Sequence, residues 1–284
     1  MRIGIIDIGS NTVRLAVYDS DTLKVIENGV NYAGLIAYVD KGAISDEGFR
    51  VLCDAILEMK RICENCLCDK ICAFATASLR DISDKDRLLQ NIKNQTGILI
   101  EIVSGEREAE LDYRGLLSNY DVKDGAVFDL GGGSAQVITF QNGKVITHIS
   151  KKIGALKLYK EFVRGVFPTQ AEEERIREYV KGQLLELESK GYTCVFAMGG
   201  AASSLKKLSR AILGIECDEF SISDLKAFSE ISENIINSVI PERLYTIKPA
   251  LIVIDEICKS LQTEKIKVTT CGVRDGMIAE LIKK

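Results

Sequence analysis

The amino-acid sequence predicts an α/β protein that contains two domains with mixed sheets. The first observation is an internal repeat, because GIIDIGSNTVRLAVYD (4–19) matches AVFDLGGGSAQVITFQ (126–141) without gaps. Each copy has two apolar runs joined by an Asp-x-Gly turn and leads into a third strand, which is the pattern of a β-meander. The second observation is that helix and strand patterns alternate after each meander, as they do in α/β folds. A duplicated domain explains both observations.

The composition allows two hydrophobic cores and argues against several classes of protein. The chain has 284 residues, of which 46% are hydrophobic. A net charge of −4 argues against a nucleic-acid partner. The opening MRIGIIDIGS is typical of a strand rather than a signal peptide, and no apolar run is long enough to span a membrane. Nine cysteines in such a chain favour reduced thiols, so we expect a cytoplasmic protein with no membrane partner.

Hydrophobic periodicity predicts the helices and strands that follow the β-meander in each half of the chain. In the first half we expect helices at 45–65, 84–97 and 106–120, and strands at 70–78 and 98–105. In the second half we expect helices at 169–191, 201–212, 223–238, 249–261 and 273–284, and strands at 193–200 and 265–272. The domain boundary is expected near 121–125, which gives domains at 1–122 and 123–272.

The two Asp-x-Gly turns are suited to bind phosphate. Glycine permits a close approach of a ligand to the backbone, and successive N–H groups in such a turn can surround an anion. Asp7 aligns with Asp129, and each is placed where it could hold a divalent cation through water. Two such hairpins facing each other across a cleft would clamp a phosphate chain with its Mg²⁺. The alternative is that the glycines serve hairpin geometry alone, but the duplication together with an aspartate in each copy favours a ligand.

Seven segments carry a resemblance to a known family. They are DIGSNTVRL (7–15), ATASLRD (75–81), SGEREA (104–109), DLGGGSAQ (129–136), IGALKLY (153–159), AMGGAASSL (197–205) and CGVRDGMIAEL (271–281). In this order they resemble the exopolyphosphatase/guanosine pentaphosphate phosphatase (Ppx/GppA) family of the actin-like ATPase and sugar kinase superfamily. The resemblance implies two ribonuclease H-like domains with an interdomain cleft, and a final helix at about 273–284 that packs back on the first domain. It also implies Mg²⁺-assisted release of terminal orthophosphate from polyphosphate, or of the 5′-γ-phosphate from guanosine pentaphosphate.

Glu108 is the expected catalytic residue. The only histidine, His148, lies in an alternating segment and is interpreted as an ordinary strand residue, so a carboxylate must orient the attacking water. Glu108 lies at a strand-to-helix junction, and the family's catalytic glutamate falls on this position. The alternative is that the acidic residues of this turn only interact with the helix dipole, which is a good account of Glu106.

The other expected site residues bind phosphate or orient water and metal. Arg80 closes ATASLR, and its guanidinium suits a pair of phosphate oxygens, although it could also be a surface arginine beside Asp81. Asp7 and Asp129 are expected to hold Mg²⁺ partly through water, and together with Gln136 to orient water. The expected phosphate ligands are Ser10, Asn11, Arg80, Gly131, Gly132, Gly133 and Ser134.

Gln136 departs from the family pattern, which has a glutamate at this position. An amide keeps hydrogen bonding but loses the negative charge. We therefore expect an active enzyme with weaker metal recruitment, with a slow hydrolase or a nucleotide sensor as the alternative. The chain also stops after the second domain, without the further helical domains of many relatives, which favours short polyphosphate or a guanosine pentaphosphate-like nucleotide as substrate.

Several alternatives stay open at this stage. A small-molecule kinase or ATPase shares the fold, although a kinase needs an acceptor base and the glutamate of SGEREA favours water. A nucleotide- or polyphosphate-binding regulator with little turnover is a second alternative. The cysteines at 63–72 could form a zinc site, although buried apolar thiols are favoured. The sequence ranks neither substrate above the other and leaves the oligomeric state open, with a homodimer as one candidate.

Overall fold

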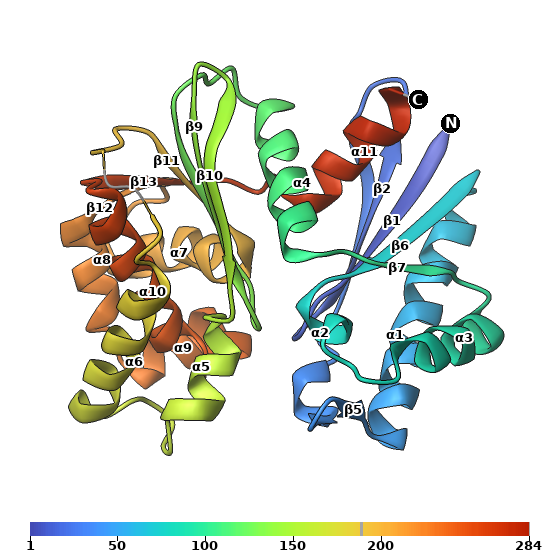
Figure 1. The fold of residues 1–284 in the computed structure, drawn as a ribbon, viewed down its shortest axis with the longest axis horizontal. Helices are drawn as coiled ribbons and strands as arrows, with labels where there is room; N and C mark the ends of the chain where they lie inside the picture. The colour runs from blue at the N-terminus through green and yellow to red at the C-terminus, as the bar shows by residue number, and fades with distance from the viewer. Residues whose placement is uncertain (188–189, 284) are drawn as a thin grey trace. The chain divides into compact units, whose positions relative to one another are not determined.

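The computed structural model describes residues 1–187 and 190–283 and divides into two compact units (Figure 1). Unit 1 comprises Met1–Ser118 together with Val273–Lys284, and unit 2 comprises Asn119–Gly272. Each unit contains one large mixed sheet, so the predicted α/β class with mixed sheets is confirmed.

Unit 1 contains a five-stranded sheet in the order β3-β2-β1-β6-β7. The first three strands form the expected antiparallel meander, and β1, β6 and β7 run parallel. Its elements are β1 (Arg2–Ile8), β2 (Val13–Asp19), β3 (Val25–Asn31), the 3-10 helix η1 (Leu35–Tyr38), β4 (Val39–Asp40), β5 (Ala43–Ile44), α1 (Asp46–Asn65), β6 (Lys70–Ala75), α2 (Ala77–Arg80), α3 (Lys85–Thr96), β7 (Ile100–Ile102), α4 (Gly105–Leu117) and α11 (Val273–Lys283).

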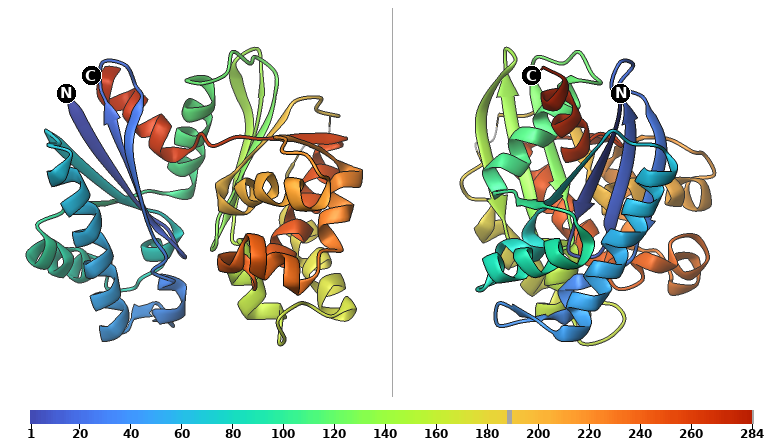
Figure 2. Two further views of the ribbon diagram at one scale, coloured as in Figure 1. Left: turned by 180° about the vertical axis from the view of Figure 1, so that it is seen from behind. Right: turned by 90° about the vertical axis from the view of Figure 1, so that its right-hand side faces the viewer.

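Both faces of this sheet are covered by helices (Figure 2). Because successive strand residues point to opposite faces, Ile6 and Ile8 pack in the core with α1 and α3. Ile3 and Ile5 pack in a second core with α4 and α11. Asp7 is two residues from Ile5 in β1, so its side chain points to the same face of the sheet as Ile3 and Ile5. This is the face covered by α4 and α11.

Helix α11 completes unit 1 although it lies far from α4 in the sequence. A Cβ atom at Gly276 would lie 2.0 Å from the carbonyl oxygen of Leu111, so the two helices touch through their backbones. Beside this contact, Arg114 Nη1 lies 2.9 Å from Glu280 Oε1, and Arg107 is paired with the same carboxylate. Unit 1 is therefore built from two separate stretches of the chain.

Unit 2 repeats the strand order of unit 1 and adds one edge strand. Its six-stranded sheet has the order β10-β9-β8-β11-β13-β12, in which β8, β11 and β13 are parallel and β12 is antiparallel. Its elements are β8 (Gly125–Leu130), β9 (Ala135–Gln141), β10 (Lys144–Lys151), α5 (Ala155–Phe162), α6 (Gln170–Gln183), β11 (Val195–Met198), α7 (Gly199–Ile212), β12 (Glu219–Ser221), α8 (Ile222–Ser229), α9 (Glu233–Val239), the 3-10 helix η2 (Pro241–Arg243), α10 (Ile247–Leu261) and β13 (Lys265–Val268).

The helix starts follow the local chemistry of the sequence. Ser45 caps α1 by accepting a hydrogen bond from the Gly48 N–H at 3.1 Å, as its position in the sequence predicts. Thr169 and Glu172 form a capping box at the start of α6. Helix α3 ends at Thr96 and is followed by Gly97, which adopts the left-handed conformation with φ of 73°.

Several expected boundaries are wrong. The helix expected at 223–238 is two helices, α8 and α9, separated at 230–232, where Ile231 is buried and Ser232 starts the second helix. The helix expected at 169–191 ends at Gln183, and residues 184–187 form turns that bury Leu184 and Leu187. The rest of that expected helix includes 188–189, which lie outside the described residues.

The strand expected at 70–78 ends at Ala75 and is followed by the short helix α2. Helix α5 and strand β12 have no counterpart among the expected elements.

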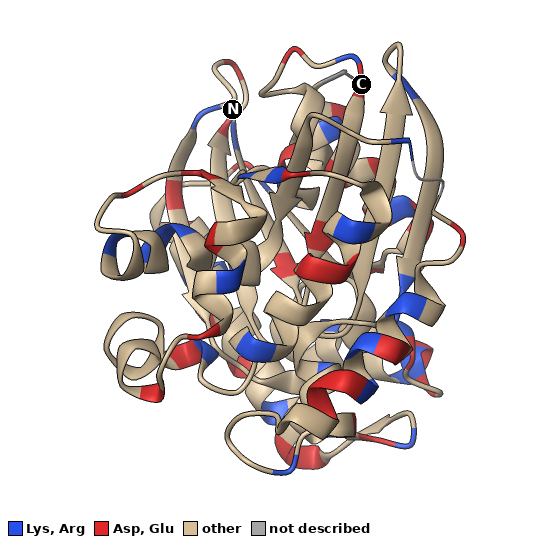
Figure 3. Cartoon of the chain, turned by 90° about the vertical axis from the view of Figure 1, so that its left-hand side faces the viewer, with Lys and Arg blue, Asp and Glu red and all other residues tan. Residues whose placement is uncertain are grey.

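Charged residues of both signs are interspersed along the helices seen in Figure 3. The described residues include no helix that is both long enough and apolar enough to cross a bilayer.

Candidate active site

The repeated hairpins have the same turn in both units. In unit 1 the Gly9 N–H donates to the Thr12 carbonyl at 2.9 Å, and in unit 2 the Gly131 N–H donates to the Ser134 carbonyl at 3.0 Å. A Cβ atom at either glycine would lie about as close to that carbonyl, at 3.2 Å in unit 1 and 3.3 Å in unit 2. The sequence repeat is therefore also a repeat of backbone geometry.

Each turn is fixed by the helix that follows its meander. In unit 1, the carbonyl of Ser10 accepts from the Ile36 N–H at 3.0 Å, and the carbonyl of Asn11 accepts from the Gly34 N–H at 2.9 Å. These donors lie at the start of η1, so the first N–H groups of that short helix are satisfied by the loop.

In unit 2 the loop carbonyls accept hydrogen bonds from the start of α5 in the same way. The carbonyl of Gly131 accepts from the Ala155 N–H at 3.0 Å, and that of Gly132 accepts from the Leu156 N–H at 3.0 Å. A Cβ atom at Gly154 would lie 2.4 Å from backbone atoms of Gly132, so the helix start and the loop are in direct contact. The start of α5 therefore binds the loop itself.

These carbonyl contacts set the direction of the loop N–H groups. A trans peptide is planar, with its C=O and the next N–H pointing in opposite directions. The N–H groups of Asn11 and Thr12 therefore point away from η1, and those of Gly132 and Gly133 point away from α5. Two successive donors pointing to one side of a turn are suited to bind an anion.

The two aspartates occupy equivalent positions with different partners. Asp7 is directly opposite Arg14 in the β1–β2 ladder, and Asp129 is directly opposite Gln136 in the β8–β9 ladder. Burial raises the pKa of Asp7, while the positive charges of Arg274 and Arg14 act in the opposite direction. Arg274 was not among the expected site residues, because it lies in the expected helix at 273–284, far from Asp7 in the sequence.

Gly199 allows α7 to begin against Asp129. Its φ is 91°, and a Cβ atom there would lie 2.4 Å from Asp129 Oδ1 and 2.5 Å from the Leu130 carbonyl oxygen. Both the left-handed conformation and the contact require glycine. The start of α7 is therefore packed against the Asp129 carboxylate.

Gln136 is buried, and its amide is occupied by two serines. Its side chain is 1% exposed. Its Nε2 donates to Ser134 Oγ at 3.0 Å and to Ser150 Oγ at 3.1 Å. Ser150 was not among the expected residues, because its place opposite Gln136 depends on the β9–β10 register.

Glu108 and Arg80, expected as base and phosphate ligand, contact each other. Ser104 caps α4 by accepting from the Arg107 N–H at 3.1 Å, which places Glu108 in the first turn with 7% of its surface exposed. Arg80 is the last residue of α2, and its Nη1 lies 3.1 Å from Glu108 Oε2 and 3.2 Å from the Val103 carbonyl oxygen. The guanidinium is thus directed to the start of α4.

The carboxyl ends of β1, β6 and β7 bring the expected residues of unit 1 to one edge of the sheet. Ser78 Oγ donates to the Ile8 carbonyl at 2.8 Å, which ties α2 to the end of β1. The Val103 N–H donates to the Ala75 carbonyl at 2.9 Å, which joins the ends of β6 and β7. Ligands of open α/β sheets bind outside the carboxyl ends of parallel strands, so this edge is the candidate site of unit 1.

The cysteines and the histidine do not join the site. The described residues contain no group of three or more His, Cys, Asp or Glu side chains that could hold a metal ion, including around 63–72. Burial raises the pKa of Cys53 to about 11 and those of Cys63 and Cys258 to about 12, so these thiols stay protonated. His148 is exposed on the edge strand β10.

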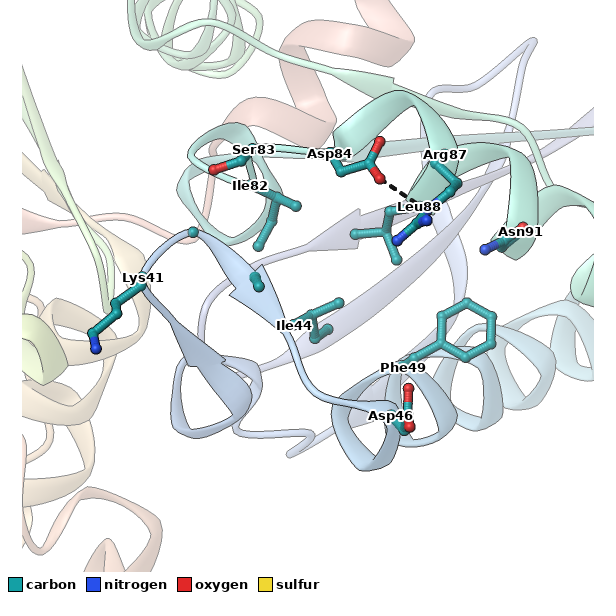
Figure 4. Close-up of a pocket in the computed structure, with 12 residues that line it drawn as sticks. Lys41, Ile44, Asp46, Phe49, Ile82, Ser83, Asp84, Arg87, Leu88 and Asn91 are labelled. Atoms are coloured by element: carbon teal, nitrogen blue, oxygen red, sulfur yellow. Dashed lines mark ion pairs between the residues drawn. The ribbon is translucent and has the colours of Figure 1, made fainter.

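A separate cavity of about 450 Å³ lies in unit 1 between the β4–β5 hairpin, the start of α1, and α3 (Figure 4). Ile82 and Leu88 form a buried apolar wall, and Arg87 Nε pairs with Asp84 Oδ2 at 2.8 Å on the rim. None of the expected site residues lines this cavity. It is therefore distinct from the candidate site.

Comparisons with known proteins identify the family of this chain. Residues 24–284 match the model of the Ppx/GppA phosphatase family. The chain is 24% identical over 310 residues to exopolyphosphatase 1 of Mycobacterium tuberculosis (strain ATCC 25618 / H37Rv), which covers 98% of this chain and 87% of that protein. It is 23% identical over 298 residues to the guanosine-5'-triphosphate,3'-diphosphate pyrophosphatase of Photobacterium profundum, with coverage of 98% and 59%, respectively.

A solved structure confirms the fold. The crystal structure of an exopolyphosphatase from Cytophaga hutchinsonii matches with a TM-score of 0.91 and 22% identity, over 100% of this chain and 98% of that chain. The resemblance expected from the seven sequence segments is confirmed by the family match, which extends over most of the length. The chain belongs to the Ppx/GppA phosphatase family.

Proposed function

We propose that this phosphoanhydride hydrolase releases terminal orthophosphate from inorganic polyphosphate or the 5′-γ-phosphate from a guanosine pentaphosphate-like nucleotide. The relatives named exopolyphosphatase and guanosine-5'-triphosphate,3'-diphosphate pyrophosphatase support both substrates. The observation that supports the proposal is the contact between Arg80 and Glu108, in which a guanidinium, a group suited to bind phosphate, lies beside a carboxylate at the start of α4.

Each loop would bind phosphate oxygens through its own backbone. In unit 1 the outward N–H groups of Asn11 and Thr12, and in unit 2 those of Gly132 and Gly133, would donate to non-bridging oxygens. Ser10 and Ser134 are buried in the same turns and would add hydroxyl donors. Arg80 would add a charged donor, which forms stronger hydrogen bonds with phosphate than neutral groups do.

Glu108 would orient the water and accept its proton. When a phosphate binds, it competes with Glu108 for the Arg80 guanidinium, and the carboxylate becomes available to the water. The water oxygen then bonds to phosphorus while the bridging P–O bond breaks, and the water proton passes to Glu108. Positioning and charge neutralisation account for most of the rate in such reactions.

Asp7 and Asp129 would hold Mg²⁺, since carboxylate oxygens are the ligands this ion prefers. Magnesium binds proteins through one or two carboxylates plus waters and substrate phosphates, so each aspartate is a suitable ligand in its own loop. When bound, the ion would neutralise charge on the phosphate oxygens. The nearby Arg14 and Arg274 charges would share that role at Asp7.

A phosphate-release assay tests the proposal. Purified protein is incubated with polyphosphate of several lengths, guanosine pentaphosphate or ATP, in Mg²⁺ or in EDTA. We expect Mg²⁺-dependent orthophosphate from polyphosphate or the pentaphosphate. ADP together with a phosphorylated acceptor would indicate a kinase instead, and tight binding without release would indicate a regulator.

A further inference from the structure

The buried amide of Gln136 has a hydrogen-bond arrangement that determines what Ser134 can offer to a ligand. Ser134 lies just before β9 and two residues before Gln136, and the two side chains are in hydrogen-bond contact. Ser150 is directly opposite Gln136 in the β9–β10 ladder. The amide Nε2 donates to both hydroxyl oxygens, at 3.0 and 3.1 Å.

Both N–H bonds of the Gln136 amide have a partner. A primary amide nitrogen has two N–H bonds, and both are used by the two serines. Each serine oxygen therefore accepts from Gln136, and its single O–H proton is directed elsewhere. The Ser134 carbonyl also closes the glycine turn by accepting from the Gly131 N–H, so the Ser134 backbone is fixed at the loop.

We infer that Gln136 is a positioning residue that makes Ser134 a hydrogen-bond donor to the substrate phosphate. A carboxylate at position 136 would have the opposite effect. Carboxylates only accept hydrogen bonds, so it would capture the Ser134 proton and turn a lone pair toward an anionic ligand. The inference rests on the proposed function, and it assigns a different role from the water- or metal-orienting one expected of Gln136.

The surroundings of Gln136 favour an uncharged donor. On its other side the amide is directly opposite Asp129, so a carboxylate here would create a like-charge cross-strand pair. The equivalent residue of unit 1 is Arg14, whose guanidinium is also a donor and is opposite Asp7. Both hairpins thus place N–H donors opposite the aspartate.

A double-mutant cycle tests the inference. The variants are Gln136→Met, which keeps the volume but removes the amide, Ser134→Ala, and the double variant. Tripolyphosphate affinity is measured by isothermal titration calorimetry, and kcat and KM are measured by phosphate release. His148→Ala, an exposed change on the strand that carries Ser150, is the matched control.

We expect Ser134→Ala to weaken tripolyphosphate binding about tenfold, the effect of one hydrogen bond to a charged group. Gln136→Met should weaken it to a similar degree, and the double variant should be no weaker than Ser134→Ala alone. KM should rise while kcat changes less. Effects that multiply in the double variant, or an unchanged affinity in Gln136→Met, would overturn the inference.

Gln136→Glu gives a second test at constant pH. The carboxylate only accepts hydrogen bonds, so it would take the Ser134 proton, and tripolyphosphate should bind as weakly as it does to Gln136→Met. Binding as tight as that of the parent would contradict the inference. If the parent releases no phosphate at all, the proposed function fails, while the titration cycle still decides the role of Gln136.

Discussion

Arg80 Nη1 lies 3.1 Å from Glu108 Oε2, so the expected phosphate ligand and the expected base are an ion pair. Arg80→Met should raise KM for polyphosphate by about tenfold or more, because a charged hydrogen bond to phosphate is lost. Steady-state phosphate release measures this effect. Arg87→Met is the control, since Arg87 is exposed and pairs with Asp84 away from the site. An equal change in both variants would exclude a specific role for Arg80.

Glu108→Gln should lower kcat by a factor of about 10² to 10⁴, the usual contribution of a general base. The change is nearly isosteric, so binding of tripolyphosphate should persist. Glu106→Gln is a matched control, because Glu106 is an exposed acid in the same helical turn. A Glu108→Gln variant that is as fast as the parent would show that another group activates the water.

Asp7 is predicted to oppose folding at neutral pH. Burial raises its pKa above the ordinary value of 3.8, so the folded state binds the proton more tightly and stability falls as pH rises through that window. Asp7→Asn should therefore raise the melting temperature at pH 7.5 in EDTA, with a smaller gain as the pH approaches 3.8, while activity falls.

Asp19 is the control, because its pKa is shifted in the opposite direction from that of Asp7. Hydrogen bonds from Thr22 lower the pKa of Asp19 below 3.8, so its stabilising effect is present above that value and is lost as pH falls. Asp19→Asn should lower the melting temperature at pH 7.5. Shifts of the same sign in both variants would contradict the assignment of Asp7 as a desolvated carboxylate.

Gly276→Ala should destabilise unit 1. The added Cβ atom would lie 2.0 Å from the Leu111 carbonyl oxygen, so α11 must move away from α4, at a cost of about 1–3 kcal/mol. Thermal unfolding and hydrogen exchange of β1 would measure the loss. Gly182→Ala is the control, because nothing lies within 4 Å of its added atom in α6. Gly182→Ala should raise the free energy of unfolding by about 0.5–1 kcal/mol.

The elements with strong local signals were predictable from the sequence. The meander repeat follows from its alternating apolar residues, and α1 follows from its Ser45 cap. The break at 230–232 was not predictable, because burial of Ile231 is a tertiary effect that overrides a continuous helical pattern. Strand β12 has only three residues, too few for periodicity to appear.

The residues of the candidate site were likewise predictable only where a local sequence motif contains them. The glycine turns, Arg80 and Glu108 were identified as candidates, since each belongs to a compact motif of the sequence. Ser150 and Arg274 were missed because their contacts depend on strand register and on the return of α11 to unit 1. The sequence motifs therefore predicted the candidate residues that lie within a motif. The residues that contact them are brought there by the fold and were not predictable.

The division of unit 1 into two stretches has a consequence for biosynthesis. As the nascent chain leaves the ribosome, residues 1–118 emerge first, yet the apolar face formed by Ile3 and Ile5 is completed only by α11. Unit 2 is continuous and can fold while that face is still incomplete. During translation the later unit should therefore reach its native state first, and the earlier one is the more exposed to chaperones and to aggregation.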